Sequence, residues 1–162
     1  MILVIDGHNL IPKIPGLHLS DLDDEPRLAE MIREYCRRKR TRAELFFDGG
    51  LPGFAQPAKG GAVHIHVISK SSSADRAIID FFMQKGRDSR NYTLISSDHY
   101  VQNQSHNLGA AVISSEQFAR ELTQTLLQPE PHSETGSERR LSSAEVDEWL
   151  EIFSQKKHKP EK

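Results

Sequence analysis

Apolar residues in this chain gather in five short runs, separated by polar segments that contain glycine and proline. The runs lie at residues 1–5 (MILVI), 43–48 (AELFFD), 63–68 (VHIHVI), 92–96 (YTLIS) and 109–114 (GAAVIS). Apolar runs of this length, bounded by turn signals, predict β-strands. The first run is uninterrupted, as in a strand covered on both faces. The third alternates apolar with polar residues, which predicts a strand at the edge of the sheet.

Between these runs, apolar residues return at the three- and four-residue spacing of helices. The predicted helices run from an Asp23 or Asp24 cap to the basic residues 37–40, from a Ser72 or Ser73 cap to about Met83, over 98–107, and from a Ser114–Gln117 capping box to about Leu127. Alternating strands and helices form parallel sheets with both faces covered. We therefore predict an α/β fold, a three-layer α/β/α sandwich around a mainly parallel sheet of about five strands, with the first strand in its centre.

The composition changes after this domain, which we assign to residues 1–127. Residues 128–141 are rich in Pro, Gly, Ser and charged residues and predict a flexible linker. A further capping box opens an amphipathic helix at 142–155, which carries Trp149, the single tryptophan of the chain. This helix is expected to pack on the domain or to dock on a partner. Residues 156–162 are predicted to be a disordered tail.

Charge and cysteine content exclude several classes of protein. The formal net charge is −2 and the pI is near 6.4, so no global basic field indicates a nucleic-acid binder. Cys36 is the only cysteine, which rules out an internal disulfide and a cysteine-rich zinc site. The first apolar run is too short for a signal peptide or a membrane span, so we expect a cytoplasmic protein without membrane association.

Four aspartates carry the candidate chemistry. Asp6, Asp48 and Asp98 lie at or just beyond the ends of predicted strands, and Asp75 lies at a predicted helix start. Ligands of parallel α/β sheets bind at the carboxyl ends of the strands near the switch point, where these side chains would meet. Mg²⁺ and Mn²⁺ prefer such oxygen ligands, and we expect Asp6, Asp75 and Asp98 to hold one of these ions. Each aspartate also suits a turn or a helix cap, so the prediction depends on their convergence.

Other polar residues near these strand ends are candidate substrate contacts. Asn9 could orient Asp6, hold a metal-bound water or touch substrate, unless it only forms a turn. Ser97 and His99 adjoin Asp98, while Lys13 and Lys70 lie on loops that leave strand ends and suit phosphate binding.

Two histidines form a separate candidate. His64 and His66 lie two residues apart and therefore share one face of a strand. They could share a metal ion, but no third ligand is evident nearby in the sequence.

Five segments together resemble a known family. They are VIDGHNLI, FFDGG, SSSADRAIIDFF, LISSDHYVQ and GAAVISSEQF, and they resemble the YacP-like branch of the NYN domains, relatives of the PIN-domain nucleases. The resemblance covers roughly residues 1–127, and SSAEVDEWLEIF is similar to a C-terminal element of some members. It implies a metal-dependent endoribonuclease, in which Mg²⁺ or Mn²⁺ in an acidic cluster activates a water that attacks the phosphodiester and leaves 5′-phosphate and 3′-hydroxyl ends. The implied catalytic residues are Asp6, Asn9, Asp48, Asp75 and Asp98.

The resemblance also implies a partner, RNA on or near ribosomes, and leaves the oligomeric state open. One departure stands beside Asp75, where many relatives have a further acidic residue and this chain has Arg76 and Ile79. A single-metal site, or a non-catalytic RNA- or ribosome-binding module that keeps the fold, is therefore the alternative. A phosphatase with an aspartyl nucleophile fits less well, because His8 stands where its second aspartate is needed.

Overall fold

A computed structural model describes residues 1–49 and 61–130 of the chain. The chain divides into two compact units, Met1–Gln128 and Pro129–Lys162, and every described helix and strand belongs to the first. The predicted helix at 142–155 and the predicted tail at 156–162 lie outside the described residues, as does most of the predicted linker.

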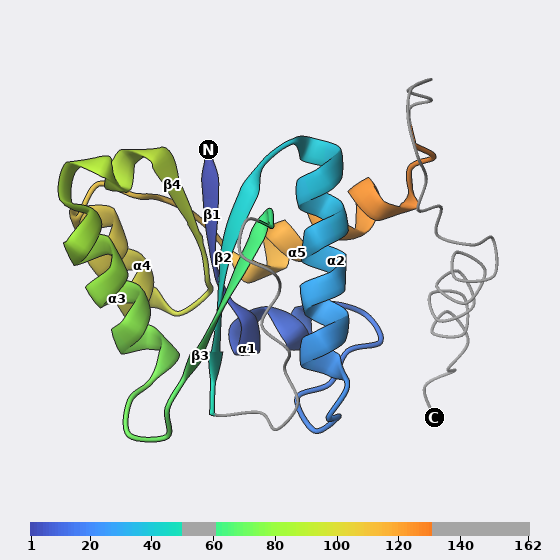
Figure 1. Cartoon of the computed structure of the whole chain (residues 1–162), viewed down its shortest axis with the longest axis horizontal. Helices are drawn as coiled ribbons and strands as arrows, with labels where there is room; N and C mark the ends of the chain where they lie inside the picture. The colour runs from blue at the N-terminus through green and yellow to red at the C-terminus, as the bar shows by residue number, and fades with distance from the viewer. Residues whose placement is uncertain (50–60, 131–162) are drawn as a thin grey trace, which may run out of the picture. The chain divides into compact units, whose positions relative to one another are not determined.

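The core of the first unit is a five-stranded parallel sheet (Figure 1). Its strands are β1 (Ile2–Asp6), β2 (Arg42–Asp48), β3 (Val63–Ile68), β4 (Tyr92–Ile95) and β5 (Ala111–Ile113). They lie in the order β3-β2-β1-β4-β5, and all four neighbouring pairs are parallel. The fold class, the central place of β1 and the edge position of β3 are confirmed.

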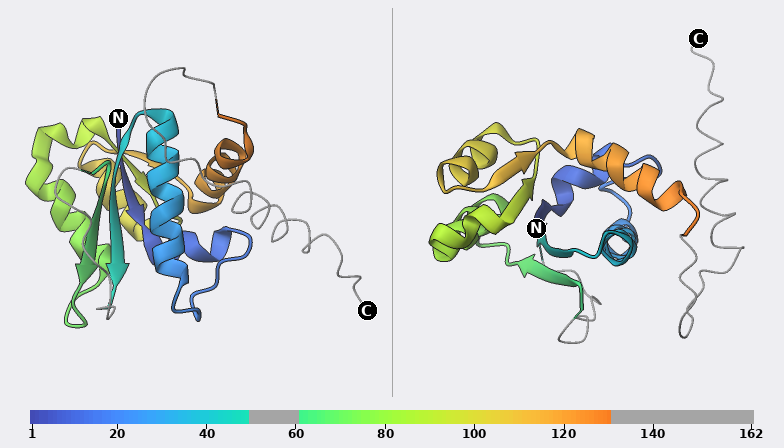
Figure 2. Two further views of the ribbon diagram at one scale, coloured as in Figure 1. Left: turned by 45° about the vertical axis from the view of Figure 1, so that its right-hand side comes forward. Right: turned by 90° about the horizontal axis from the view of Figure 1, so that it is seen from above.

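Helices cover both faces of the sheet and complete the three layers (Figures 1 and 2). The helical segments are α1 (Gly7–Leu10), η1 (Ile11–Lys13), α2 (Asp24–Lys39), α3 (Ala74–Lys85), η2 (Gly86–Asn91), α4 (His99–Asn107) and α5 (Ser115–Leu127), where η marks a 3₁₀ helix. Helices α3 and α4 lie on one face, and α1, α2 and α5 on the other. No helix in residues 1–49 and 61–130 is both long and apolar enough to cross a membrane.

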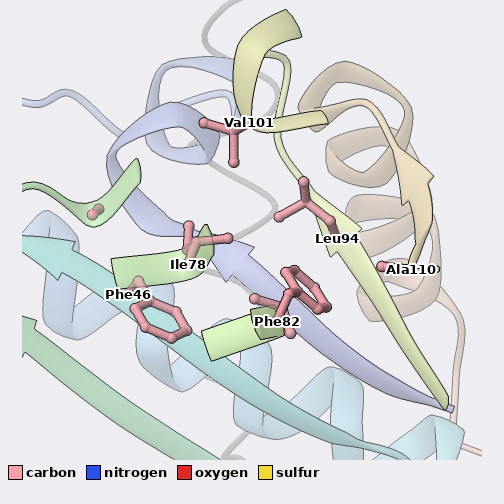
Figure 3. Close-up of a cluster of buried hydrophobic side chains, with 8 residues drawn as sticks. Phe46, Ile78, Phe82, Leu94, Val101 and Ala110 are labelled. Carbon is pink, nitrogen blue, oxygen red and sulfur yellow. The ribbon is translucent and has the colours of Figure 1, made fainter. Parts of the chain in front are cut away.

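Side chains alternate between the two faces of the strands and build a core on each. On the α3–α4 face, Val4, Phe46 and Leu94 pack against Ile78 and Phe82 of α3 in one buried cluster (Figure 3). Leu3, Ile5, Leu45 and Phe47, on the opposite face, are also buried. Each fully buried side chain of this size stabilises the fold by roughly 1.5–3 kcal/mol.

The main difference from the sequence prediction lies directly after β1, where a loop was expected. Helix α1 begins at once, because the Asp6 carboxylate caps it by accepting the backbone N–H of Asn9. Gly7 permits this sharp change of direction: a Cβ there would lie 2.3 Å from the Phe47 ring and 2.9 Å from the Phe46 carbonyl oxygen. The sequence shows the cap and the glycine, but the close approach of β2 is a tertiary fact.

A smaller correction concerns the start of α3. Ser73, one of the two expected residues, is the N-cap and accepts the backbone N–H of Arg76 at 3.2 Å. Asp75 is consequently the second residue of the helix. A Ser72 cap would have made it the third and allowed a capping box with Ser72, which the structure does not have.

Candidate functional site

Three of the four candidate aspartates lie at the carboxyl edge of neighbouring central strands. Asp6 ends β1 and Asp48 ends β2, while Asp98 follows β4 and is the N-cap of α4. Strand β1 lies between β2 and β4 in parallel register, so the three strand ends face the same way. Asp75 reaches the same edge from the first turn of α3.

Asp6 is the most buried of these carboxyls, with 5 % of its surface exposed. Burial raises its pKa from 3.8 to about 6; the hydrogen bond from the Asn9 amide opposes the rise, and the charges of Asp75 and Asp48 add to it. The charge of neighbouring His8 acts in the lowering direction. Burial and the neighbouring carboxylates therefore outweigh the Asn9 hydrogen bond and His8, and they disfavour the charged form of Asp6.

Asp48 and Asp75 meet at the start of α3. The Asp48 Oδ1 atom accepts the backbone N–H of Ala74 at 2.5 Å, which fixes the end of β2 to the first residue of the helix. The pKa of Asp75 is raised by burial and further by the charges of Asp98 and Asp48. The charges of Asp48 and Asp75 thus act on Asp6, and those of Asp48 and Asp98 act on Asp75, which connects the four aspartates in one acidic group.

Asp98 is fixed by its own helix and by the strand before it. Its Oδ1 atom accepts the Val101 N–H at 3.0 Å, and its backbone N–H donates to Ser96 Oγ at 3.2 Å. The capping role and the candidate metal-binding role are compatible here, because one carboxylate oxygen serves the cap and a carboxylate has two.

The chemistry of this acidic edge fits a hard divalent cation. Within the described part of the chain, the one trio of ligand atoms that all lie within 4.8 Å of one another is Glu44, His64 and His66, so the aspartates do not form a closed cage. Mg²⁺ does not need one, because it usually keeps several waters and takes one or two carboxylates together with substrate phosphate. Burial and neighbouring acids disfavour the charged form of Asp6, and such an ion would stabilise that form.

Asn9 connects three elements at this edge. Its Oδ1 atom accepts the Ser97 N–H at 2.8 Å and the Ser115 hydroxyl at 2.7 Å, while its own backbone N–H donates to Asp6. The amide oxygen of Asn9 therefore holds the end of β4 and the start of α5 beside α1.

Two of the predicted substrate contacts have partners within the protein. The Lys13 ammonium lies 2.7 Å from Glu116, and the Ser97 hydroxyl donates to the same carboxylate. Ser97 Oγ also accepts the Ser115 N–H at 2.9 Å. The hydrogen bonds from Lys13 and Ser97 lower the pKa of Glu116 to about 2. Sequence reasoning did not single out Glu116, because an acidic residue is common in the first turn of any helix and Glu116 lies in the first turn of α5.

Lys70 and His99, which were also predicted as substrate contacts, are exposed. Lys70 lies between β3 and α3, and His99 is the first residue of α4. His8 follows Asp6 by two residues but pairs with Glu25 of α2. Its Nε2 atom lies 2.5 Å from the Glu25 carboxylate.

A family model for the YacP-like NYN domain matches residues 3–155. The chain belongs to the YacP-like NYN domain family. The match extends beyond residue 127 and so includes the segment that was predicted as a C-terminal helix. No curated protein matches the sequence.

Solved structures of similar fold come from the same family. The crystal structure of Rae1 (YacP) from Bacillus subtilis has a TM-score of 0.65 at 18 % identity, over 97 % of this chain and 83 % of that one. A tryptophan-to-leucine mutant of the same protein has a TM-score of 0.61 at 22 % identity, over 77 % and 76 %. These likenesses establish a shared fold.

Proposed function

We propose that the protein is a metal-dependent endoribonuclease that hydrolyses RNA phosphodiesters. Asp6, Asp75 and Asp98 would hold Mg²⁺ or Mn²⁺, with Asp48 beside them. The observation that carries the proposal is the convergence of four aspartates at the carboxyl edge of a parallel sheet, where ligands of such sheets bind. Helix caps hold these carboxyls close together although they repel one another. A bound cation would offset this repulsion, which is the reason to infer a metal site.

The residues around the carboxylates have separate parts in this proposal. A bound ion supplies a water of lowered pKa and offsets charge on the phosphodiester. Asn9 positions Asp6 and Ser97 through its hydrogen bonds and thereby sets the shape of the site. Lys70 and His99, which are exposed, are available to phosphates of an incoming strand. Lys13 reaches phosphate only by leaving or sharing Glu116.

The proposed substrate is RNA on or near ribosomes in the cytoplasm. Its support is membership of the YacP-like NYN family, whose domains are nuclease-like and RNA-related. The segment at 142–155, with Trp149, is the proposed docking element, and it falls within the family match.

A second candidate is a non-catalytic RNA- or ribosome-binding module with the same fold. Arg76 favours it, because this cation stands beside Asp75, where the family resemblance implies a further acid. Its side chain is 74 % exposed and lies 3.3 Å from Asp80, one turn along α3. An exposed arginine at this place suits binding of a phosphate backbone more than it suits a second metal ion.

RNA cleavage decides between the two candidates. Full-length protein is incubated with RNA in Mg²⁺, in Mn²⁺ and in chelator, and products are resolved on a gel with their end groups identified. We expect metal-dependent cleavage by the wild type and a loss of at least about 100-fold in Asp6→Asn and Asp98→Asn, because each removes a charged metal ligand. The products should carry 5′-phosphates.

Asp80→Asn is the matched control, since Asp80 lies on α3 one turn beyond Asp75 and pairs with exposed Arg76. It should cleave like the wild type. Full cleavage by both Asp6→Asn and Asp98→Asn would refute the site, and metal-independent RNA binding without cleavage would replace the nuclease with the binding module.

A further inference from the structure

A second group of ionisable side chains lies on the sheet edge formed by β2 and β3. His64 and His66 lie on one face of β3, and the parallel register places Glu44 of β2 opposite His64. Glu44 Oε2 lies 3.1 Å from His64 Nδ1 and 2.6 Å from His66 Nε2. The ligand atoms of all three residues lie within 4.8 Å of one another. Glu44 is the third partner that the sequence did not show.

This cluster is separate from the acidic edge. Along β2, Glu44 precedes Asp48 by four residues, which corresponds to about 13 Å in an extended strand. None of its three members belongs to the proposed nuclease site, so the inference stands independently of that function.

Two imidazoles and one carboxylate are a ligand set typical of zinc and related transition metals. Zinc sites with three protein ligands keep a water in the fourth position, with metal–nitrogen and metal–oxygen distances of about 2.0–2.2 Å. Ligand atoms around such a tetrahedral ion lie about 3.3–3.5 Å apart. The distances from Glu44 Oε2 to His64 Nδ1 and His66 Nε2, 3.1 and 2.6 Å, are shorter than this. Rotations of the side chains would open room for an ion. Mg²⁺, which prefers oxygen ligands, suits this set poorly.

The surroundings hold two of the three ligands in place. The His66 ring stacks on Phe46, with centroids 4.3 Å apart and planes at 8°, and also contacts the edge of Phe81. Burial favours a raised pKa for Glu44, but the hydrogen bonds and charges of His66 and His64 outweigh it and lower the pKa. His64, 64 % exposed, forms the side open to solvent.

We propose that Glu44, His64 and His66 form a binding site for a zinc-class divalent cation, with water completing the coordination. The ion would join β2 to the edge strand β3. Because its ligands come together only in the folded chain, binding would stabilise the fold in proportion to the free metal concentration. The competing explanation is a carboxylate that only accepts hydrogen bonds from two histidines.

Titration of the full-length, untagged, metal-stripped protein with Zn²⁺ by calorimetry tests the proposal, with Co²⁺ absorption as the spectroscopic readout. The wild type should bind one equivalent at the cluster, give the visible bands of tetrahedral Co²⁺, and gain thermal stability with Zn²⁺. His64→Gln and His66→Gln should each weaken Zn²⁺ binding by at least about tenfold, since each removes one of three ligands.

Matched controls separate this site from others. His106→Gln removes an exposed histidine of α4 that lies outside both proposed metal sites, and it should bind Zn²⁺ as the wild type does. His64→Gln keeps the test decisive if the loss of ring stacking unfolds His66→Gln, because His64 is mostly exposed. Absence of Zn²⁺ binding by the wild type, or unchanged binding by a folded His64→Gln/His66→Gln double variant, would overturn the proposal.

Discussion

At the scale of single residues, the acidic edge combines two roles in one side chain. The Asp6 carboxylate caps α1 and is also buried beside other acids, which raises its pKa to about 6. The cap stabilises the fold, whereas the buried charge opposes it. A folded carboxyl with a raised pKa retains a proton that the unfolded chain has released, so folding stability falls as pH rises from about 4 to about 6.

This balance predicts that Asp6→Asn stabilises the metal-free protein. Asparagine keeps an oxygen for the cap and carries no charge. In chelator at pH 7.5 the free energy of unfolding should therefore rise by on the order of 3 kcal/mol, since the Asp6 pKa rises from 3.8 to about 6 and one pKa unit corresponds to about 1.4 kcal/mol. The gain should shrink toward zero near pH 4, where Asp6 is already protonated. Urea denaturation at both pH values measures it.

The same experiment with Mn²⁺ connects stability to the proposed function. The ion should stabilise the wild type more than Asp6→Asn, because only the wild type retains this ligand. Asp80→Asn, at a partly exposed position of α3, should change the stability little at either pH. An Asp6→Asn variant less stable than the wild type in chelator at pH 7.5 would contradict the assignment of a buried, repelled charge.

At the scale of elements, the site is assembled from helix starts placed against strand ends. Asp6 and Asp98 cap α1 and α4, and Asp48 accepts the first N–H of α3. A helix N-terminus favours a nearby anion. The first turns of α1, α3 and α4 therefore stabilise the carboxylates that accept their N–H groups. Ser73 sets where α3 begins and thereby where Asp75 lies.

The cap of α3 gives a prediction with a neighbouring control. Ser73→Ala removes the acceptor of the Arg76 N–H and should lower the free energy of unfolding by about 1 kcal/mol. Ser72→Ala, one residue earlier and exposed, should change it by less than about 0.5 kcal/mol. Urea unfolding of both variants under the same conditions tests the difference. Equal destabilisation by the two substitutions would show that the cap is assigned to the wrong serine.

At the scale of the whole first unit, Asn9 joins segments from both ends of the described chain. Its side-chain oxygen links α1 to Ser97 beyond β4 and to Ser115 at the start of α5. Lys13 and Glu116 add an ion pair between the same regions. The acidic edge therefore depends on contacts between segments about 90–110 residues apart in the chain.

Loss of this junction should be costly. Asn9→Ala leaves the buried Ser115 hydroxyl and the Ser97 amide without their acceptor, so we expect destabilisation by about 1–3 kcal/mol. Asn103→Ala, at an exposed position of α4, should lie within about 0.5 kcal/mol of the wild type. Thermal and urea unfolding provide the comparison. A variant at Asn9 as stable as the wild type would show that the junction contributes nothing to the fold.

Much of this architecture follows from local sequence alone. Uninterrupted and alternating apolar runs predicted the five strands, and capping residues such as Ser114 predicted helix starts. Their alternation was enough to predict a parallel sheet, and with it the expectation that Asp6, Asp48 and Asp98 share one edge. These features are readable because strand and helix periods, caps and turns act over a few neighbouring residues.

Only the tertiary structure decided which side chains meet across elements. Strand register placed Glu44 beside His64 and His66, turning a pair without a third ligand into a three-residue cluster. Packing of β2 against α1 made Gly7 necessary, and burial raised the pKa of Asp6. Register, close packing and desolvation are properties of segments far apart in the chain, so no local pattern specifies them. The sequence alone determined the helices and strands and the positions of the aspartates at their ends. The tertiary structure determined which residues the aspartates contact and how burial shifts the pKa of Asp6 and Asp75.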